Sequence, residues 1–241
     1  MRESASGLTL IAAAAVIVVV AVLAVGLSQG APVPVTRVLF VGNSYTSYND
    51  GLDKQLERLA PSVVTEGVTY GGFTLENHWT DGHALQAIHR GGWTYVVLQD
   101  QSVTPVLHAA EFYQYGRAFA DEIRQVGASA VLLMTWERPD AVAEGVTSGA
   151  IEAAYDGLGD SIGARVAPAG TAFAASLRQR PDLALNLRDG HPTPYGTYLA
   201  GCVVYGTIFG ITPVGNVAPD PGIPVDVQAY LQGIAARALG Y

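Results

Sequence analysis

The feature that most constrains this chain is an apolar run at residues 38–41, Val-Leu-Phe-Val, which ends at Gly42 and leads into Asn43 and Ser44. Four consecutive apolar residues are typical of a strand that is buried on both faces of a parallel sheet. Leucines at helical spacing follow over residues 52–59, so the chain turns from strand to helix near Ser44. A side chain at such a turn stands at the carboxyl edge of the sheet, where open α/β sheets bind ligands.

Two interpretations of Asn43 and Ser44 follow from this position. The backbone N–H groups at the turn are unpaired and can receive an anion, which suits a nucleophilic serine with an oxyanion pocket. Alternatively, the two residues only cap the helix that follows. This stretch by itself leaves both interpretations open, so the other loops of the chain have to distinguish them.

Strand and helix patterns alternate along most of the sequence. The expected strands cover residues 36–41, 62–69, 95–99, 130–135 and 165–168, and the expected helices cover residues 51–60, 84–90, 109–126, 150–163, 172–179, 194–209 and 225–239. This alternation predicts an α/β fold, namely a three-layer α/β/α sandwich with a central parallel sheet. The loops at the carboxyl ends of its strands would then build the functional site.

The N-terminal segment predicts export. Residues 8–27 are almost wholly apolar and uncharged, and about twenty such residues can span a bilayer as a helix. This run is longer than the apolar core of most signal peptides, about 7–15 residues, so we favour an uncleaved signal anchor over a cleaved signal peptide. The expected organisation is residues 1–30 as anchor or signal peptide, 31–36 as linker and 37–241 as one domain. That domain would be extracytoplasmic and membrane-anchored through residues 8–27, or secreted after cleavage.

Composition excludes several function classes. The net charge is −8 and the 13 basic residues form no cluster, so nucleic acid is not an expected partner. The single cysteine, Cys202, rules out an internal disulfide and a cysteine-based metal site, and its apolar helical context indicates a core thiol. His78, Asp81 and His83 have the residue types of a metal site, but nothing completes the set, and we expect His78 to be a solvated loop residue. No cofactor or metal is expected.

Four of the loops, in order along the chain, resemble the sequence blocks of the SGNH (GDSL-like) hydrolase superfamily. The matching segments are Gly42-Asn43-Ser44, Tyr70-Gly71-Gly72-Phe73-Thr74-Leu75, Val97-Leu98-Gln99-Asp100-Gln101-Ser102 and Asp189-Gly190-His191-Pro192. Asn43 replaces the aspartate that is usual before the nucleophile, as in a subgroup with Gly-Asn-Ser. The resemblance covers most of the chain after the linker and implies the flavodoxin-like sandwich of that superfamily.

The resemblance implies a role for each matched residue. Ser44 would be the nucleophile and His191 its general base. The family places an aspartate three residues before the histidine, but Arg188 holds that place here and Asp189 comes one residue later. Either Asp189 or a backbone carbonyl would therefore orient the imidazole.

The implied oxyanion hole has one position that the sequence leaves open. Its donors would be the N–H groups of Ser44 and Gly72 and a side-chain amide of the third block. That block usually supplies an asparagine, and glutamine has to serve here. Gln99 resembles the glutamine of carbohydrate-esterase branches, whereas Gln101 aligns better by its distance from the strand.

These residues predict an exported serine esterase that hydrolyses an acyl ester, with an O-acetyl group on a carbohydrate suggested by the glutamine. The alternatives are an acyltransferase that uses the same triad and a non-catalytic glycan-binding module, which the displaced aspartate favours. A nucleotide-binding flavodoxin-like domain fits less well, because no glycine-rich phosphate loop follows the first strand.

Two sets of flanking residues have more than one interpretation, and a third has one. Trp136, which follows a strand, is suited equally to stacking on a sugar and to packing in the core. Tyr45 and Tyr48 either line the cleft or pack on the first helix. Glu137 and Arg138 are expected to form a local ion pair, which contributes little to stability.

Overall fold

The computed structural model describes residues 35–216 and 220–241. The expected signal anchor, including the apolar run at residues 8–27, lies outside them, as does most of the expected linker. Over the described ranges, no helix is both long enough and apolar enough to cross a membrane.

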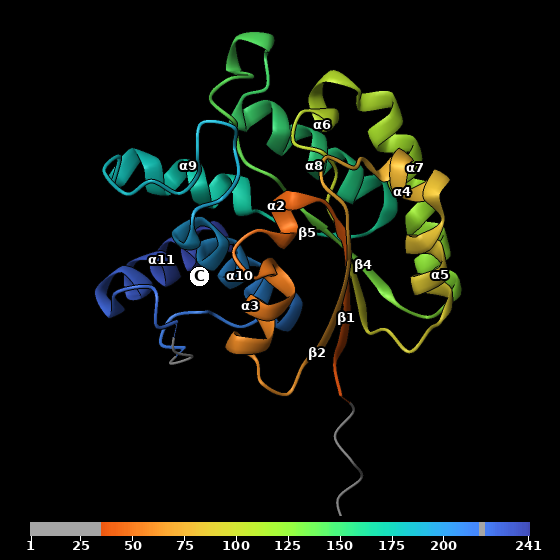
Figure 1. The fold of residues 1–241 in the computed structure, drawn as a ribbon, viewed down its shortest axis with the longest axis horizontal. Helices are drawn as coiled ribbons and strands as arrows, with labels where there is room; N and C mark the ends of the chain where they lie inside the picture. The colour runs from red at the N-terminus through yellow and green to blue at the C-terminus, as the bar shows by residue number, and fades with distance from the viewer. Residues whose placement is uncertain (1–34, 217–219) are drawn as a thin grey trace, which may run out of the picture. The chain divides into compact units, whose positions relative to one another are not determined.

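A five-stranded parallel sheet forms the centre of the described fold (Figure 1). Its strands are β1 (Arg37–Gly42), β2 (Val64–Thr69), β3 (Tyr95–Leu98), β4 (Ser129–Leu133) and β5 (Arg165–Ala167). They lie side by side in the order β2-β1-β3-β4-β5, which is the flavodoxin-like order. Each predicted strand forms within two residues of its expected bounds, so the α/β class and the parallel sheet are confirmed.

Helices connect the strands and cover both faces of the sheet. They are α2 (Ser44–Ser47), α3 (Gly51–Leu59), α4 (Leu75–Asp81), α5 (His83–His89), α6 (Thr104–Leu107), α7 (Ala109–Gln125), α8 (Ser148–Ile162), α9 (Ala169–Gln179), α10 (Pro194–Phe209) and α11 (Val225–Ala238), with a 3₁₀-helix, η1 (Val142–Glu144). The sequence patterns did not predict α2, α4, α6 or η1. These elements have seven residues or fewer and few apolar residues at helical spacing, in contrast to the equally short but more apolar α5, which was predicted.

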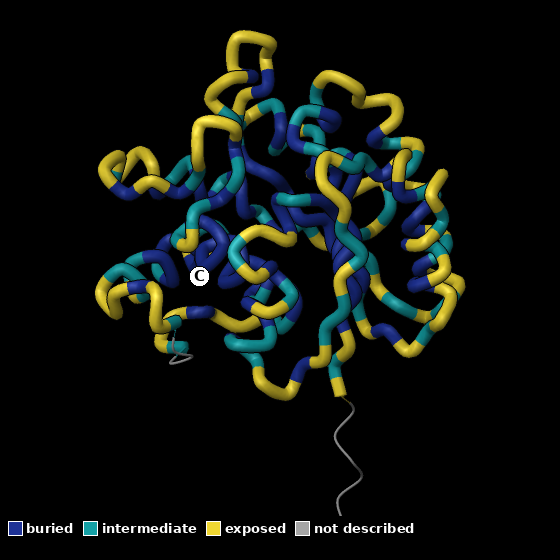
Figure 2. Tube along the Cα trace, in the orientation of Figure 1, coloured by how far each residue is buried: buried dark blue, intermediate teal, exposed yellow. Residues whose placement is uncertain are grey.

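The apolar run of β1 divides between two hydrophobic cores. Val38 and Phe40 pack in the core that α3, α9, α10 and α11 cover, whereas Leu39 and Val41 pack in the core under α4, α5, α7 and α8. All four side chains are fully buried. Figure 2 shows that the strands at the centre of the fold are largely buried. Because burying one such side chain stabilises a fold by about 1.5–3 kcal/mol, both faces of β1 contribute strongly.

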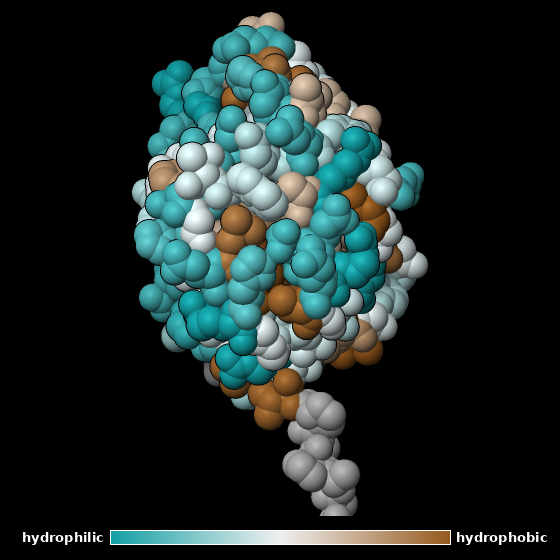
Figure 3. Space-filling view, turned by 90° about the vertical axis from the view of Figure 1, so that its right-hand side faces the viewer, coloured by the Kyte–Doolittle hydropathy of each residue, from teal (hydrophilic) through white to brown (hydrophobic). Residues whose placement is uncertain are grey.

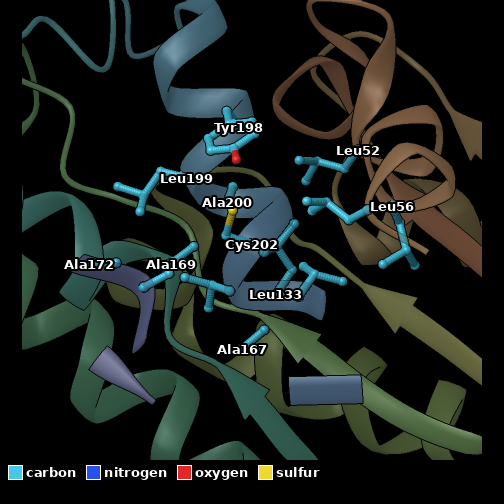
Figure 4. Packing of buried hydrophobic residues seen from close by; sticks show 14 of the residues in the cluster. Leu52, Leu56, Leu133, Ala167, Ala169, Ala172, Tyr198, Leu199, Ala200 and Cys202 are labelled. Atoms are coloured by element: carbon cyan, nitrogen blue, oxygen red, sulfur yellow. The ribbon is translucent and has the colours of Figure 1, made fainter. Parts of the chain in front are cut away.

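Helix α10 is the centre of the first core. It is apolar around its whole circumference, because α3, α9 and α11 surround it as well as the sheet. Figure 4 shows Leu52 and Leu56 of α3 facing the α10 residues Ala200 and Cys202. Cys202 is fully buried, as predicted, and burial raises the pKa of its thiol to about 12.

The opposite face of the molecule is mostly hydrophilic. Figure 3 shows the side that α5 and α7 cover, where apolar residues form only small separate patches. Helix α7 explains this pattern, because its inward positions Phe112, Gly116, Phe119 and Ile123 are buried at spacings of three and four residues. Ala120 is buried beside them, and the other positions of α7 are exposed or partly exposed and mostly polar.

Candidate active site

The strand order places one crevice at the carboxyl edge of the sheet. The connection after β1 leads to β2 on one side, and the connection after β3 leads to β4 on the other side, so the loops after β1 and β3 separate above this point. Ligands of open α/β sheets bind at such a topological switch point. The loop after β1 carries Ser44, and the loop after β3 carries Gln99 and Gln101.

Ser44 and His191 meet in this crevice although 147 residues separate them in the chain. The distance from Ser44 Oγ to His191 Nε2 is 2.8 Å, which is a hydrogen bond. Ser44 is the first residue of α2, and Asn43 caps that helix by accepting a hydrogen bond from the Tyr45 N–H at 3.0 Å. A serine hydroxyl in contact with an imidazole is the geometry that transfers the serine proton to a base.

Asp189 lies beside the other nitrogen of the imidazole. Its Oδ2 is 3.0 Å from His191 Nδ1, and its Oδ1 accepts a hydrogen bond from the His191 backbone N–H at 3.2 Å. These contacts with His191 hold the pKa of the Asp189 carboxyl below its usual range, and the side-chain contact has the largest effect. Although the two atoms are close, the Nδ1–H bond does not point toward Oδ2. The contact is therefore a close approach and not an aligned hydrogen bond.

The backbone carbonyl considered as the alternative partner is not in place. Within the described ranges, no carbonyl oxygen accepts a hydrogen bond from His191 Nδ1. The Asp189 side chain is 61% exposed, so solvent screens its charge. Of the two partners expected from the sequence, the structure brings only the carboxylate close to the ring.

Two aromatic side chains fix the loop that carries His191. The Tyr45 hydroxyl donates to the Asp189 carbonyl at 3.1 Å, and Trp136 Nε1 donates to the Gly190 carbonyl at 2.8 Å. Gly190 has a φ of 85°, and a Cβ at this position would lie 1.6 Å from the Tyr45 hydroxyl oxygen. Only glycine therefore allows the loop to approach this closely.

The same aromatic residues form a stack inside the fold. Trp136 lies parallel to Tyr45 at 5.1 Å and to Phe173 at 4.1 Å between ring centroids. Trp136 is buried, so it packs in the core and presents no surface for sugar stacking. Burial raises the pKa of Tyr45 to about 12, which keeps its hydroxyl protonated as a donor.

Tyr48 and Asn49 complete the surroundings of His191. The exposed Tyr48 ring lies 4.7 Å from the imidazole between centroids. Asn49 Nδ2 donates to the Pro192 carbonyl at 2.8 Å and to Thr197 Oγ1 at 2.9 Å. Tyr48 thus lines the crevice, whereas Tyr45 packs beneath it.

Gly72 forms the turn between β2 and α4. It has a φ of 73° and is exposed, and the described part of the chain provides no acceptor for its N–H. A Cβ would meet nothing within 4 Å, so the backbone angle and not crowding favours glycine here. Ser44 N–H, at the first position of α2, also has no intrahelical acceptor.

The two glutamines of the third block have different environments. Gln99 is buried, and its Oε1 accepts from the Asn43 N–H at 2.9 Å and from Thr46 Oγ1 at 2.8 Å. Its Nε2 donates to Asn43 Oδ1 and to the Asp100 carbonyl. Gln101 accepts from the Val103 N–H at 2.8 Å, and its Nε2 has no partner among the described residues.

His78 is not the solvated loop residue that the sequence led us to expect. It is fully buried, and its Nε2 lies 2.7 Å from the Gly42 carbonyl oxygen. The expectation was wrong because α4 was not recognised as a helix. With Leu75 and His78 three residues apart on α4, both face the core.

The expected ion pair between Glu137 and Arg138 does not form. Arg138 instead binds Asp140 with Nε at 2.7 Å and Nη2 at 2.6 Å. Glu137 accepts from the Ser148 N–H at 2.8 Å at the start of α8. A helix N-terminus attracts a carboxylate, and the sequence pattern did not show that α8 begins beside Glu137.

No model of a known protein family matches this sequence, and no curated protein matches it. Solved structures do resemble it. A proposed SGNH hydrolase from Slackia heliotrinireducens is 25% identical, with a TM-score of 0.65 over 72% of this chain and 98% of that one. A DUF4886 family protein from Bacteroides uniformis is 18% identical, with a TM-score of 0.67 over 86% of this chain and 95% of that one.

A third resemblance is to Axe2, an acetylxylan esterase from Geobacillus stearothermophilus. It is 11% identical, with a TM-score of 0.53 over 74% of this chain and 95% of that one. The structural neighbours of this chain are therefore SGNH or GDSL-like hydrolases and esterases, and the chain has their α/β fold.

Proposed function

We propose that this protein is a serine esterase in which Ser44, His191 and Asp189 form the catalytic triad. The observation that carries the proposal is the 2.8 Å contact between Ser44 Oγ and His191 Nε2 at the switch point of the sheet. The neutral imidazole accepts the Ser44 proton while Oγ attacks the ester carbonyl carbon. The carboxylate of Asp189 lies on the other side of the ring, where it stabilises the imidazolium that forms.

The tetrahedral intermediate carries negative charge on the former carbonyl oxygen. The N–H groups of Ser44 and Gly72 and the amide of Gln101 receive this charge in our assignment. Gln101 is preferred to Gln99, because both heavy atoms of the Gln99 amide are already engaged by neighbouring groups. His191 then returns the proton to the leaving alcohol, and water attacks the acyl-Ser44 in a second round of the same chemistry.

The substrate that we propose is a small acyl ester, with an O-acetyl group on a carbohydrate as the specific candidate. Axe2 is an acetylxylan esterase, and its fold resembles this one. The exposed Tyr48 ring beside His191 offers an apolar surface next to the reacting atoms. Export through residues 1–30 would bring the site to extracytoplasmic carbohydrate, with the anchor at residues 8–27 retained or removed.

Hydrolysis of p-nitrophenyl acetate by the purified full chain tests the proposal. Ser44→Ala is expected to lower kcat by at least about a thousandfold, because the nucleophile is lost. Ser47→Ala is the matched control, because Ser47 is an exposed serine on the same short helix. Equal activity of the wild type and Ser44→Ala would refute the proposal.

One observation favours a second candidate, the non-catalytic glycan-binding module. The poor direction of the Nδ1–H bond toward Asp189 leaves the imidazole less firmly oriented than in an aligned triad. A fluorophosphonate probe separates the candidates, since it labels an activated serine. Labelling that requires Ser44 supports the esterase, whereas glycan binding without labelling supports the module. Adding an alcohol acceptor and measuring the product ratio separates hydrolysis from acyl transfer.

A further inference from the structure

We propose that His78 is a positioning residue. It holds the Gly42–Asn43 peptide unit and the Gly71–Gly72 turn in one fixed arrangement. The inference rests on the proposed esterase function, because its consequence is the alignment of the oxyanion donors. His78 does not touch the reacting atoms. It acts through its contacts with Gly42 on one side and with the turn on the other.

The hydrogen bond to Gly42 defines the state of the His78 ring. A carbonyl oxygen can only accept, so Nε2 carries the proton in its 2.7 Å contact with Gly42. Nδ1 is buried without a hydrogen-bond partner within the described ranges, and burial lowers the pKa of the ring, which favours the neutral form. An apolar side chain would avoid the unpaired nitrogen. What histidine supplies here is therefore its N–H.

That N–H fixes the peptide unit immediately before the Asn43-Ser44 pair. The Gly42 carbonyl accepts from His78 and from the Tyr70 N–H at 3.2 Å. The N–H of the same peptide unit, on Asn43, donates to Gln99 Oε1 at 2.9 Å. Because both ends of the unit are held, it cannot rotate. The direction in which the chain enters α2 is thereby set.

The opposite side of His78 holds the turn that carries Gly72. Its ring packs edge-on against Phe73 at 5.1 Å and lies 5.8 Å from the Tyr70 ring between centroids. These two aromatic residues flank Gly71 and Gly72. Asn43 Nδ2 also donates to the Phe73 carbonyl at 2.8 Å, so the turn has a second tie to the nucleophile segment.

The consequence concerns two N–H groups that no described residue occupies. Ser44 N–H lies on the segment that follows the fixed peptide unit, and Gly72 N–H lies on the turn. Donors accelerate a reaction when they already point to where charge develops, and removing one typically costs about 10²–10³-fold in kcat. If His78 no longer connects the Ser44 segment to the Gly72 turn, the two N–H groups remain but are less well aligned. Part of the rate acceleration is then lost.

Two substitutions separate this role from simple core packing. His78→Phe keeps an aromatic ring against Tyr70 and Phe73 but has no donor for Gly42. His78→Gln keeps an N–H at a position similar to Nε2. We expect His78→Phe to lower kcat for p-nitrophenyl acetate about 10–100-fold with KM within about twofold, because the loss falls on the transition state. We expect His78→Gln to retain kcat within about fivefold of the wild type, because its amide N–H can still donate to the Gly42 carbonyl.

His89→Gln is the control for replacing a histidine, since His89 is exposed on α5 and pairs with Glu122. Each variant is assayed well below its midpoint of thermal unfolding. A His78→Phe chain that is folded and has wild-type kcat would overturn the inference, whatever its thermal midpoint. If His78→Phe does not fold, His78→Gln is compared with His78→Asn, whose shorter amide does not reach Gly42. Equal kcat for these two variants would also overturn the inference.

The test distinguishes failure of this inference from failure of the proposed function. A wild-type chain that is active through Ser44, together with insensitivity to His78→Phe, rejects only the positioning role. A wild-type chain no more active than Ser44→Ala rejects the esterase assignment, and the positioning role fails with it.

Discussion

The hydroxyl of Tyr45 donates a hydrogen bond to the carbonyl oxygen of Asp189 across 3.1 Å. Tyr45 directly follows the serine, and Asp189 lies two residues before His191, so this bond joins the two halves of the site without involving a reacting atom. The Tyr45 ring is held in turn by its stack on Trp136, which donates to the next carbonyl of the same loop. The position of the imidazole over the serine is therefore supported from the core.

Replacing Tyr45 with Phe tests this support. The variant keeps the stack on Trp136 and loses only the hydrogen bond, so the free energy of unfolding should fall by about 0.5–1.5 kcal/mol. Ester hydrolysis should fall by up to about tenfold, because the His191 loop gains freedom relative to Ser44. Chemical denaturation and steady-state kinetics measure the two effects. A loss of stability with unchanged kcat would show that the contacts of Trp136 and Asn49 hold the loop in place without the Tyr45 hydroxyl.

The role of Asp189 is tested by comparing Asp189→Asn with His191→Ala. Removing the base should abolish nearly all activity, a loss of at least about a thousandfold. Asp189→Asn should lose less, about 10–100-fold, because the carboxylate is exposed and poorly aligned with Nδ1. The measurement is the rate of ester hydrolysis by both variants at neutral pH. Equal losses in the two variants would show that the carboxylate aligns fully with the ring during the reaction.

Asp100 gives a prediction for the pH dependence of stability. The carboxyl is buried, and desolvation raises its pKa to about 7, although it accepts hydrogen bonds from the N–H groups of Gln101 and Leu75. An unfolded aspartate has a pKa of about 3.9, so the unfolded chain releases this proton first as pH rises. The contribution of the protonated group is complete below about pH 4 and is lost as pH rises to about 7.

Asp100→Asn removes this titration while keeping an oxygen that can accept both hydrogen bonds. The thermal midpoint of the variant should match that of the wild type near pH 4 and exceed it at pH 8. Thermal unfolding followed by circular dichroism across this range is the measurement. A difference between the two chains that does not change with pH would show that Asp100 keeps an ordinary pKa in the fold.

The sequence predicted the sheet because β1, β3 and β4 are buried on both faces, which leaves continuous apolar runs in the chain. It did not predict α4, because this short helix has only two apolar residues, Leu75 and Trp79, although Thr74 and Asn77 form a capping box at its start. The burial of His78 was missed for the same reason. The capping residues Thr74 and Asn77 are the sequence signal that indicates the start of α4.

The meeting of Ser44 with His191 was predictable in outline, because the resemblance to the SGNH hydrolase blocks assigns both residues to one site. The partners of Asn43 were not predictable. Its Oδ1 accepts from Tyr45 and Gln99, and its Nδ2 donates to the Phe73 carbonyl. An amide can both accept and donate, whereas an ionised carboxylate can only accept, so asparagine suits this point where three loops meet in space. Sequence spacing contains no record of such long-range pairing.

Substitutions of the two glutamines should differ in their effect on stability. Gln99→Ala leaves the Asn43 N–H and Thr46 Oγ1 without their buried acceptor, so the free energy of unfolding should fall by about 1–3 kcal/mol. Gln101 is only partly buried and its side chain makes one hydrogen bond among the described residues, from the Val103 N–H, so Gln101→Ala should lower the free energy of unfolding less than Gln99→Ala does. Its kcat should nevertheless fall about 10²–10³-fold, because an oxyanion donor is lost. Denaturant unfolding and steady-state kinetics on both variants test the assignment. If Gln101→Ala is fully active, its amide does not contact the oxyanion and the donor must come from another group.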